Sequence, residues 1–334
     1  MATSLFLLVG SSVLINGIGL DLSEIASAQQ QPQANFTSAE QKLLNEGNSF
    51  KIDNVTFSHH MATVNDIQLH YVMGGKGDPV VLLHGWPQTW YEWRKVMPAL
   101  AKNYTVIAPD LRGLGDSSKP PTGYDTKNVA EDIHQLVTQL GFKSIFLVGH
   151  DIGTLVSYPY AAAHPTGVEK LVVMESPIPP FLPPGRLPSW WNIFNQVPDV
   201  PELLVEGRER EFLSWFYDNE AYNSDAITQE AIEEYVSKYS APGGMRAGFE
   251  YYRAIPQDVM QNLNYSKTNL TMPVLALGAG YHKYEGNVTQ PLNIYSMERL
   301  AQNVTGVVVP NSGHWIPEEQ PKFLVEQLAK FFKE

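Results

Sequence analysis

The sequence contains no cysteine, and this absence excludes two features at once. No disulfide can frame the fold, and no thiol can act as a nucleophile. A chain of 334 residues, 43% of them hydrophobic, can bury a large core without crosslinks. The composition therefore predicts one large α/β domain with room for an inserted subdomain.

Clustered positive charge is also missing. The chain has 23 Lys and Arg against 35 Asp and Glu, a net charge of −12, and no run of basic residues stands out. An acidic chain without a basic stripe is poorly suited to bind phosphate backbones or anionic membranes. We expect no nucleic-acid partner.

The N-terminus lacks an apolar run long enough for a comfortable membrane span. Its mostly apolar stretch, Leu5 to Ile18, is short and interrupted by Gly and Asn, and Ala26-Ser27-Ala28 gives an A-x-A cleavage pattern. We predict a signal peptide over residues 1–28, and a secreted or extracytoplasmic protein with no stable membrane insertion after cleavage. The segment has no Lys or Arg before the apolar stretch, so an uncleaved membrane anchor is the alternative.

Alternating strand and helix patterns follow a Gln- and Ala-rich segment, residues 29–49, which we interpret as flexible. Helical spacing of apolar residues marks Val129–Leu140 and Phe323–Phe332. Such alternation predicts a mostly parallel sheet with helices on both faces, built from residues 50–176 and 271–334. The expected strands are Ile67–Met73, Val80–Leu83, Thr105–Ala108, Ile145–Val148, Leu171–Met174, Val274–Leu277 and Val304–Val309.

The alternation breaks over residues 177–270. A Pro- and Trp-rich stretch from Pro177 to Pro201 comes first, and helical segments such as Leu203–Tyr217 and Ile227–Tyr239 follow. A long stretch without a convincing strand, between two strands, predicts a helical cap inserted into the sheet domain.

The most informative motif is Gly149-His150-Asp151-Ile152-Gly153, between an apolar strand and a helix. It has the G-x-nucleophile-x-G pattern of a nucleophile elbow, a tight turn that needs small residues on both sides. The helix that follows supplies backbone N–H groups and partial positive charge beneath the nucleophile. The alternative is a Gly pair beside an Asp that caps a helix.

An aspartate at the elbow sets the chemistry. A carboxylate attacks an sp³ carbon that carries a leaving group, and the enzyme becomes an alkyl ester of Asp151. Water must then cleave the ester, which requires a base and an oxyanion hole. We predict His314 as the base, because it follows the last strand, and the N–H groups of Ile152 and Trp86 as oxyanion donors.

The other histidines lack such a context. His134 lies in an amphipathic helix, and His59 and His60 precede the predicted domain, so we expect structural or solvated roles. His150 lies inside the elbow, where a structural role competes with contact to the substrate.

Three motifs together resemble the α/β-hydrolase-fold epoxide hydrolases: the H-G-x-P turn His84-Gly85-Trp86-Pro87, the elbow, and the terminal Gly313-His314-Trp315. The similarity covers roughly residues 55 to 334, and the run from Asp110 to Ser117 resembles another turn of the family. The resemblance implies an α/β-hydrolase fold with a helical cap, conversion of an epoxide to a diol, and no metal or organic cofactor.

The resemblance also implies the third member of the catalytic triad. Most members carry an acid after the strand that follows the cap, but here that stretch, Leu277 to Tyr281, has no carboxylate. A subset of bacterial epoxide hydrolases, and the fluoroacetate dehalogenases, place the acid after the preceding strand, where this sequence has Glu175. Glu175 is therefore expected to orient His314 and stabilise its imidazolium, with Glu285 in reserve.

The cap must supply an acid for the leaving oxygen. The run Phe249-Glu250-Tyr251-Tyr252-Arg253-Ala254 resembles the family segment with a ring-opening tyrosine before the Arg, which implies Tyr252, with Tyr251 as its competitor. A second oxygen-binding histidine of the subset is replaced here by Trp191, whose indole N–H donates a hydrogen bond but does not readily transfer a proton. Aromatic residues of the cap imply an apolar pocket, with Trp191, Tyr251 and Phe194 as substrate contacts.

Dehalogenation is the nearest alternative reaction. Haloalkane dehalogenases resemble this chain but hold the halide with an aromatic residue and an Asn, where this sequence has Ile152 and Trp86. Fluoroacetate dehalogenases clamp a carboxylate with arginines, where this sequence has Ile152 and Leu155. We therefore predict an epoxide hydrolase for a small apolar epoxide, with a dehalogenase or a non-catalytic binding protein of the same fold as alternatives. The oligomeric state stays open, a homodimer included.

Overall fold

A computed structural model describes residues 48–283 and 286–334 of the chain. The predicted signal peptide, almost all of the predicted flexible segment, and Glu285 lie outside the described residues. Over the described part, no helix is both long enough and apolar enough to cross a membrane.

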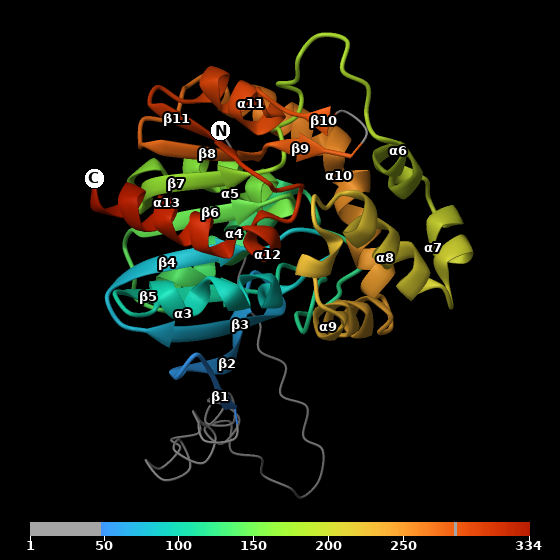
Figure 1. The fold of residues 1–334 in the computed structure, drawn as a ribbon, viewed down its shortest axis with the longest axis horizontal. Coiled ribbons are helices and arrows are strands. Elements are labelled where there is room, and N and C mark those ends of the chain that lie inside the picture. Colours follow the sequence, from blue (N-terminus) through green and yellow to red (C-terminus); the bar gives the residue numbers. More distant parts are fainter. Residues whose placement is uncertain (1–47, 284–285) are drawn as a thin grey trace, which may run out of the picture. The chain divides into compact units, whose positions relative to one another are not determined.

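A nine-stranded sheet forms the centre of the fold, in the order β1-β2-β3-β5-β4-β6-β7-β8-β11 (Figure 1). The strands from β5 to β11 in this order pair in parallel, whereas β1, β2, β3 and β5 pair antiparallel. The prediction of a mostly parallel α/β sheet is confirmed. The strands are β1 (Ser49–Ile52), β2 (Val55–Val64), β3 (Ile67–Gly75), β4 (Asp78–Leu83), β5 (Tyr104–Pro109), β6 (Ile145–His150), β7 (Val168–Met174), β8 (Val274–Ala279) and β11 (Val304–Val309).

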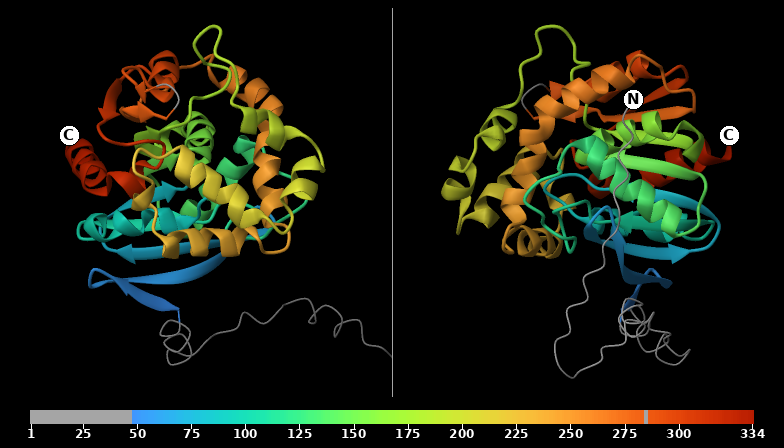
Figure 2. Two further views of the ribbon diagram at one scale, coloured as in Figure 1. Left: turned by 45° about the vertical axis from the view of Figure 1, so that its right-hand side comes forward. Right: turned by 180° about the vertical axis from the view of Figure 1, so that it is seen from behind.

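Two hydrophobic cores lie on opposite faces of this sheet, because successive side chains of a strand point to opposite sides. In β4, Val81 and Leu83 join one core and Val80 and Leu82 the other. The first core is covered by α4 (Thr126–Gln139), α5 (Ile152–Ala163) and α11 (Leu292–Leu300), the second by η1 (Trp90–Lys95), α3 (Met97–Leu100) and α13 (Pro321–Lys333). Figures 1 and 2 show these faces from opposite sides.

Helices alone fill the chain between β7 and β8, and we call residues 175–273 the helical insertion. It lies beyond the carboxyl ends of the parallel strands, at the right of Figure 1. Its elements are α6 (Trp190–Gln196), α7 (Val200–Val205), α8 (Glu209–Asn219), η3 (Ser224–Ala226), α9 (Gln229–Tyr239) and α10 (Gly244–Tyr265). The remaining short elements are η2 (Pro165–Gly167), β9 (Tyr281–His282), β10 (Gly286–Asn287) and α12 (Ile316–Glu319).

Two local predictions were wrong. The helical segment expected over Leu203–Tyr217 is broken between α7 and α8, where Gly207 has a φ of +74°, a conformation that does not continue a right-handed helix. His59 and His60, expected to precede the domain, lie in β2, where His60 pairs with Tyr71 of β3. The strand escaped prediction because β2 lies near the edge of the sheet and carries several polar residues.

Candidate active site

Asp151 occupies a strained turn between β6 and α5. Its backbone has a φ of +49°, which a residue other than Gly rarely adopts. The turn is possible because glycines flank it: a Cβ on Gly153 would lie 2.1 Å from the Leu83 carbonyl oxygen, and one on Gly149 would lie 2.4 Å from the Gly153 carbonyl oxygen. The backbone thus presents the Asp151 carboxylate at the carboxyl end of the sheet.

The two oxygens of Asp151 have different surroundings. The Trp86 N–H donates to Oδ1 over 2.9 Å, so Oδ1 lies at one of the two predicted oxyanion donors. The Ser176 hydroxyl donates to Oδ2 over 3.1 Å, and His314 Nε2 lies 3.5 Å from the same oxygen. Oδ2 is therefore the oxygen that faces the base.

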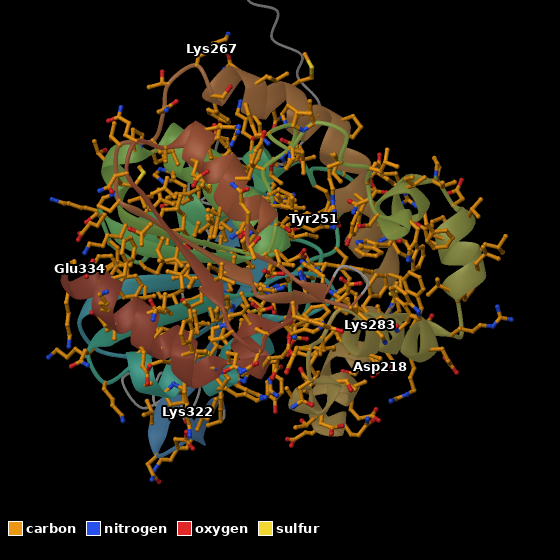
Figure 3. The ribbon with its side chains drawn as sticks, turned by 45° about the horizontal axis from the view of Figure 1, so that its top comes forward. Asp218, Tyr251, Lys267, Lys283, Lys322 and Glu334 are labelled. Atoms are coloured by element: carbon orange, nitrogen blue, oxygen red, sulfur yellow. The ribbon has the colours of Figure 1, made fainter. Side chains whose placement is uncertain are left out.

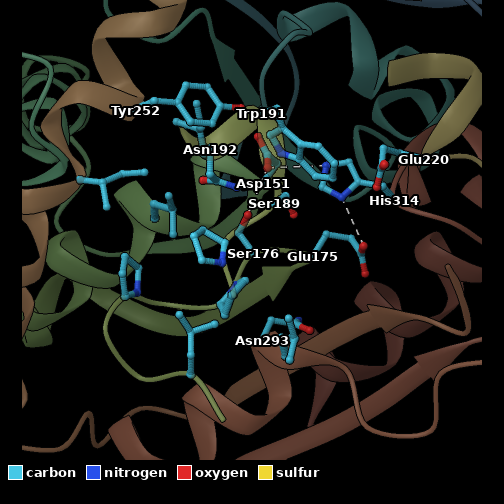
Figure 4. Close-up of a pocket in the computed structure, with 18 of the residues that line it drawn as sticks. Asp151, Glu175, Ser176, Ser189, Trp191, Asn192, Glu220, Tyr252, Asn293 and His314 are labelled. Atoms are coloured by element: carbon cyan, nitrogen blue, oxygen red, sulfur yellow. Dashed lines mark hydrogen bonds and ion pairs between the residues drawn. The ribbon is translucent and has the colours of Figure 1, made fainter. Parts of the chain in front are cut away.

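His314 lies between two carboxylates. Its Nδ1 is 3.3 Å from Glu175 Oε2, while its Nε2 faces Asp151 (Figure 4). Glu175 has a φ of +67° directly after β7, and its Oε1 accepts the Ala279 N–H over 2.5 Å. Ala279 ends β8, the strand after which the resemblance implied an acid for most members of the family. Glu175 therefore reaches this position from the neighbouring strand.

The charges of this group are coupled. Burial alone would raise the pKa of Asp151, but hydrogen bonding to His314 and the charge of His314 lower this pKa to about 2. Burial opposes protonation of His314, yet the carboxylates of Asp151 and Glu175 raise its pKa well above the usual value. Both shifts favour a resting pair of a carboxylate and an imidazolium.

Tyr252 comes from α10 and lines the same cavity as Asp151 (Figure 4). Helix α10 approaches closely because residue 248 is Gly: a Cβ there would lie 2.4 Å from Trp86 Nε1. Burial, with Asp151 next in effect, raises the pKa of Tyr252 well above its ordinary value, so the phenol keeps its proton. The neighbouring Tyr251 hydroxyl instead donates to the Arg112 carbonyl oxygen over 2.8 Å, which ties it to the core.

A cavity of about 580 Å³ opens above Asp151. Of the predicted substrate contacts, Trp191 and Tyr251 line it, as does Ile152. Trp191, Asn192 and Tyr252 line the same cavity as Asp151 (Figure 4). The remaining lining is mixed: Pro, Leu, Ile and Trp side chains supply apolar surface that suits an apolar substrate, beside polar and charged side chains.

Two of the predicted substrate contacts lie away from the cavity. His150 is fully buried: its Nε2 is 2.8 Å from the His314 carbonyl oxygen and its Nδ1 is 3.3 Å from Glu92 Oε2. These contacts tie His150 to the loop of His314 and to Glu92, which suits a structural role. Phe194 packs against Phe212 instead of lining the cavity, because α6 turns that side chain toward α8.

Several polar side chains of the cavity were not predicted as site residues, among them Ser176, Asn192 and Glu220. The position of Ser176, next to the predicted triad acid, is the only signal in the sequence that would have pointed to it. Asn192 and Glu220 belong to the helical insertion, and no motif places their side chains relative to Asp151.

A second group of titratable side chains, His70, Asp110 and Asp116, has spacing that could suit a metal ion. Asp110 already accepts hydrogen bonds from the backbone N–H groups of Trp90 and Asp116, and His70 Nδ1 lies 2.7 Å from it. His59 Nδ1 lies 2.9 Å from His70 Nε2 with the ring centroids 5.1 Å apart, a nearly collinear hydrogen bond. With the donor set occupied in this way, we assign the group a structural role around the Asp110 turn.

Comparisons with known proteins agree with this geometry. Residues 78–321 match the model of the alpha/beta hydrolase fold family. The soluble epoxide hydrolase of Corynebacterium sp. (strain C12) is 38% identical over 286 residues, which cover 82% of this chain and 97% of that protein. The crystal structure of Cfl2 from Burkholderia cenocepacia superimposes with a TM-score of 0.78 at 38% identity, covering 83% of this chain and 96% of that one.

A dehalogenase is also among the relatives. The fluoroacetate dehalogenase of Burkholderia sp. is 31% identical over 211 residues, which cover 59% of this chain and 69% of that protein. The chain belongs to the α/β hydrolase fold family. It is a hydrolase similar to the epoxide hydrolases, with dehalogenases among its relatives.

Proposed function

We propose that the protein hydrolyses an apolar epoxide to a vicinal diol through a covalent ester on Asp151. The observation that carries the proposal is that three groups meet at one cavity: the Tyr252 phenol, the Asp151 carboxylate and the His314 imidazole. The Glu175 carboxylate lies 3.3 Å from the other side of the imidazole. The chain's similarity to a soluble epoxide hydrolase supports the substrate class.

In the first step, Asp151 Oδ2 attacks one carbon of the epoxide. The carbon–oxygen bond of the ring breaks, and the released oxygen takes the proton of the Tyr252 hydroxyl. The Trp191 indole and the Asn192 amide, which line the same cavity, would donate hydrogen bonds to this oxygen. The products are an alkyl ester on Asp151 and a phenolate on Tyr252.

Ester formation changes the charge around His314. The negative charge of Asp151 disappears, so one of the two carboxylates that raise the pKa of His314 is lost. The imidazolium then gives up its proton, which restores the Tyr252 phenol. The base becomes neutral only after the ester exists, and this order prevents it from acting too early.

In the second step, neutral His314 takes a proton from water while the water oxygen attacks the Asp151 carboxyl carbon. The developing charge on Oδ1 is stabilised by the Trp86 N–H, and the Ile152 N–H is the expected second donor. The tetrahedral intermediate then collapses, and the bond between the Asp151 carboxyl carbon and the alkyl oxygen breaks. The alkyl oxygen takes the second proton of the former water molecule, and the diol leaves. The carboxylate–imidazolium pair is then restored.

The cavity also bears on dehalogenation, the second candidate. A Trp191 indole N–H at the cavity suits a halide as well as an oxygen. However, Ile152 and Leu155 occupy the positions of the arginines that clamp a carboxylate in the resembled fluoroacetate dehalogenases. The Arg and Lys side chains that line this cavity, Arg186 and Lys283, come from other positions. Epoxide hydrolysis therefore has the stronger support.

The test is intact-protein mass spectrometry of His314→Gln mixed with small epoxides and with matched halogenated compounds. Without the base, the alkyl ester should persist on Asp151. An adduct of the full epoxide mass supports the proposal, whereas an adduct that forms only from halogenated compounds, lighter by hydrogen halide, makes the protein a dehalogenase. The double variant Asp151→Asn/His314→Gln is the control and should form neither adduct.

We also propose that residues 1–28 direct export and are removed, which the A-x-A pattern before Gln29 supports. Mass spectrometry of the exported protein should find Gln29 at its N-terminus. Recovery of the full-length chain in the membrane fraction would instead indicate an uncleaved anchor.

A further inference from the structure

The backbone of the catalytic His314 is held by the helical insertion as well as by the sheet domain. The His314 N–H donates to the carbonyl oxygen of Glu220, which follows α8, over 2.7 Å. The contact is close because the preceding residue is Gly313, where a Cβ would lie 2.3 Å from the same carbonyl oxygen. The two loops therefore cannot move independently without breaking this bond.

A carboxylate on α12 fastens the same two loops together. The Glu319 side chain accepts the backbone N–H groups of Tyr222 and Asn223, over 2.8 and 2.9 Å, and that of Gly313 over 2.9 Å. Three backbone donors on one carboxylate form a rigid link, because each bond has a charged acceptor. We call this arrangement the Glu319 clasp.

The clasp holds the backbone of the loop that carries Glu220. The Glu220 carboxylate sits beside the His314 imidazole in Figure 4, and it lines the same cavity as Asp151 and Glu175. Burial raises the pKa of Glu220, and the nearby His314 opposes this effect. The Glu220 carboxylate therefore shares a cavity with the proposed base, yet the two reaction steps described above give it no role.

The charged groups around this pair come from several elements. His314 faces Asp151, Glu175, Glu220 and the ring of His150. Glu220 faces His314, Glu175, His282 and Lys283. Lys283 is exposed, and it lies beside the end of α8 near Asp218 (Figure 3), where its Nζ donates to Asn219 Oδ1 over 2.9 Å. Asp151, Glu175 and Glu220 are thus three carboxylates that share the cavity with the imidazole.

We propose that Glu220 is a positioning residue that serves His314 as a further carboxylate during ester hydrolysis; this inference rests on the proposed function. Once Asp151 is an ester, Glu175 and Glu220 are the anions left to stabilise the imidazolium that forms when water is deprotonated. Glu220 takes no proton and forms no bond to the substrate. It acts through its charge and through the loop that the clasp holds.

The first test follows ester hydrolysis in single turnovers across pH. Glu220→Gln keeps the shape but removes the charge, so the pKa of His314 in the ester state falls and the acid limb of the hydrolysis rate moves down by about half a pH unit or more. The plateau rate is expected to fall by about two- to tenfold, because the imidazolium is less stabilised. The rate of ester formation should stay within about twofold of wild type.

Two matched variants separate charge from structure. Glu220→Asp keeps the charge and should restore the acid limb. Glu319→Gln weakens the clasp but leaves Glu220 charged, so it should slow hydrolysis without moving the limb as Glu220→Gln does. If the acid limb of Glu220→Gln coincides with that of wild type, Glu220 has no electrostatic role and the proposal fails.

A second measurement needs no substrate. Asp151→Asn imitates the neutral ester, and NMR titration of the His314 ring in this background should give a lower pKa when Glu220→Gln is added. Equal titrations would overturn the inference on Glu220. A lower pKa in an enzyme that opens no epoxide would overturn only the proposed function, so the two failures are distinguishable.

Discussion

Glu175 has a strained backbone, and its two carboxylate oxygens have different partners. One accepts the Ala279 N–H, and the other lies near the His314 ring. Glu175→Gln keeps the first contact but removes the charge that stabilises the imidazolium. We expect ester formation to survive and ester hydrolysis to slow by on the order of 10²- to 10⁴-fold. Rapid-quench mass spectrometry should then detect accumulated ester.

The control for this variant is Glu169→Gln, at an exposed position of β7. It should hydrolyse the ester at the wild-type rate. Unchanged hydrolysis in Glu175→Gln would show that another acid orients His314, and Glu285 would become the next residue to change.

The adjacent tyrosines Tyr251 and Tyr252 should behave differently. Tyr252→Phe removes the proton donor above Asp151, and we expect ester formation to slow by about a hundredfold or more. Tyr251→Phe loses only the hydrogen bond to the Arg112 carbonyl oxygen, so it should lower the free energy of unfolding by about 1 kcal/mol with little change in rate. Stopped-flow kinetics and chemical denaturation of both variants check the assignment, and the opposite pattern would exchange the two roles.

At the residue scale, chain order and motif spacing predicted that Asp151 and His314 would meet, and the resemblance to a subset of epoxide hydrolases added Glu175. All three follow strands of one parallel sheet, and such residues gather at its carboxyl edge. Spacing could not reveal that His150 points beneath the catalytic loop or that Phe194 points toward α8. Those orientations depend on tertiary packing. The same is true of the position of Glu220, whose loop is held near His314 by the Glu319 clasp.

The elbow between β6 and α5 is the element on which the site depends. Gly153→Ala would place a Cβ 2.1 Å from the Leu83 carbonyl oxygen, and backbone atoms of β4 cannot move aside as a side chain could. We expect a loss of about 3 kcal/mol in the free energy of unfolding, together with lost activity. Gly167→Ala is the control, because its nearest contact would be an ordinary 3.6 Å from His164 Cβ. Chemical denaturation of the two variants should separate them; equal stabilities would mean that α5 can shift away from β4.

At the scale of elements, the buried strands were predictable because continuous Val, Ile and Leu runs fit a strand covered on both faces. β2 was not, since its alternation includes exposed and polar residues near the sheet edge. The break between α7 and α8 depends on a single Gly207 in a left-handed conformation. The hydrophobic pattern is judged over a longer window of residues, so the effect of one such position is not visible in it.

Asp258 makes the stability of the whole molecule depend on pH. It lies on α10 with 1% of its surface exposed, and its Oδ1 accepts the N–H and the hydroxyl of Thr126. Burial raises its pKa to about 7 from an ordinary value of 3.8. Because the folded value is the higher one, the stabilising contribution is complete below the unfolded value and is lost as pH rises through the folded value.

Asp258→Asn removes the charge that must be buried at high pH but can still accept from Thr126. We expect the melting temperature of the variant, relative to wild type, to be several degrees higher at pH 8.5 than at pH 5 (roughly 2–4 °C per kcal/mol for a chain of this size). Calorimetry at the two pH values measures this difference. The exposed Asp225→Asn should show no such trend, and a constant difference for Asp258→Asn would mean that Asp258 stays protonated or hydrated throughout.

The Glu319 clasp has a consequence for how this protein can be recombined. Its donors come from the helical insertion and from the loop of His314, about ninety positions apart in the chain. The insertion is therefore not a portable module. A chimera that receives the insertion of a relative, with the aim of a new substrate range, would need residues 311–319 from the same donor. If these residues are not transferred as well, the new insertion would no longer hold the backbone of the loop that carries His314.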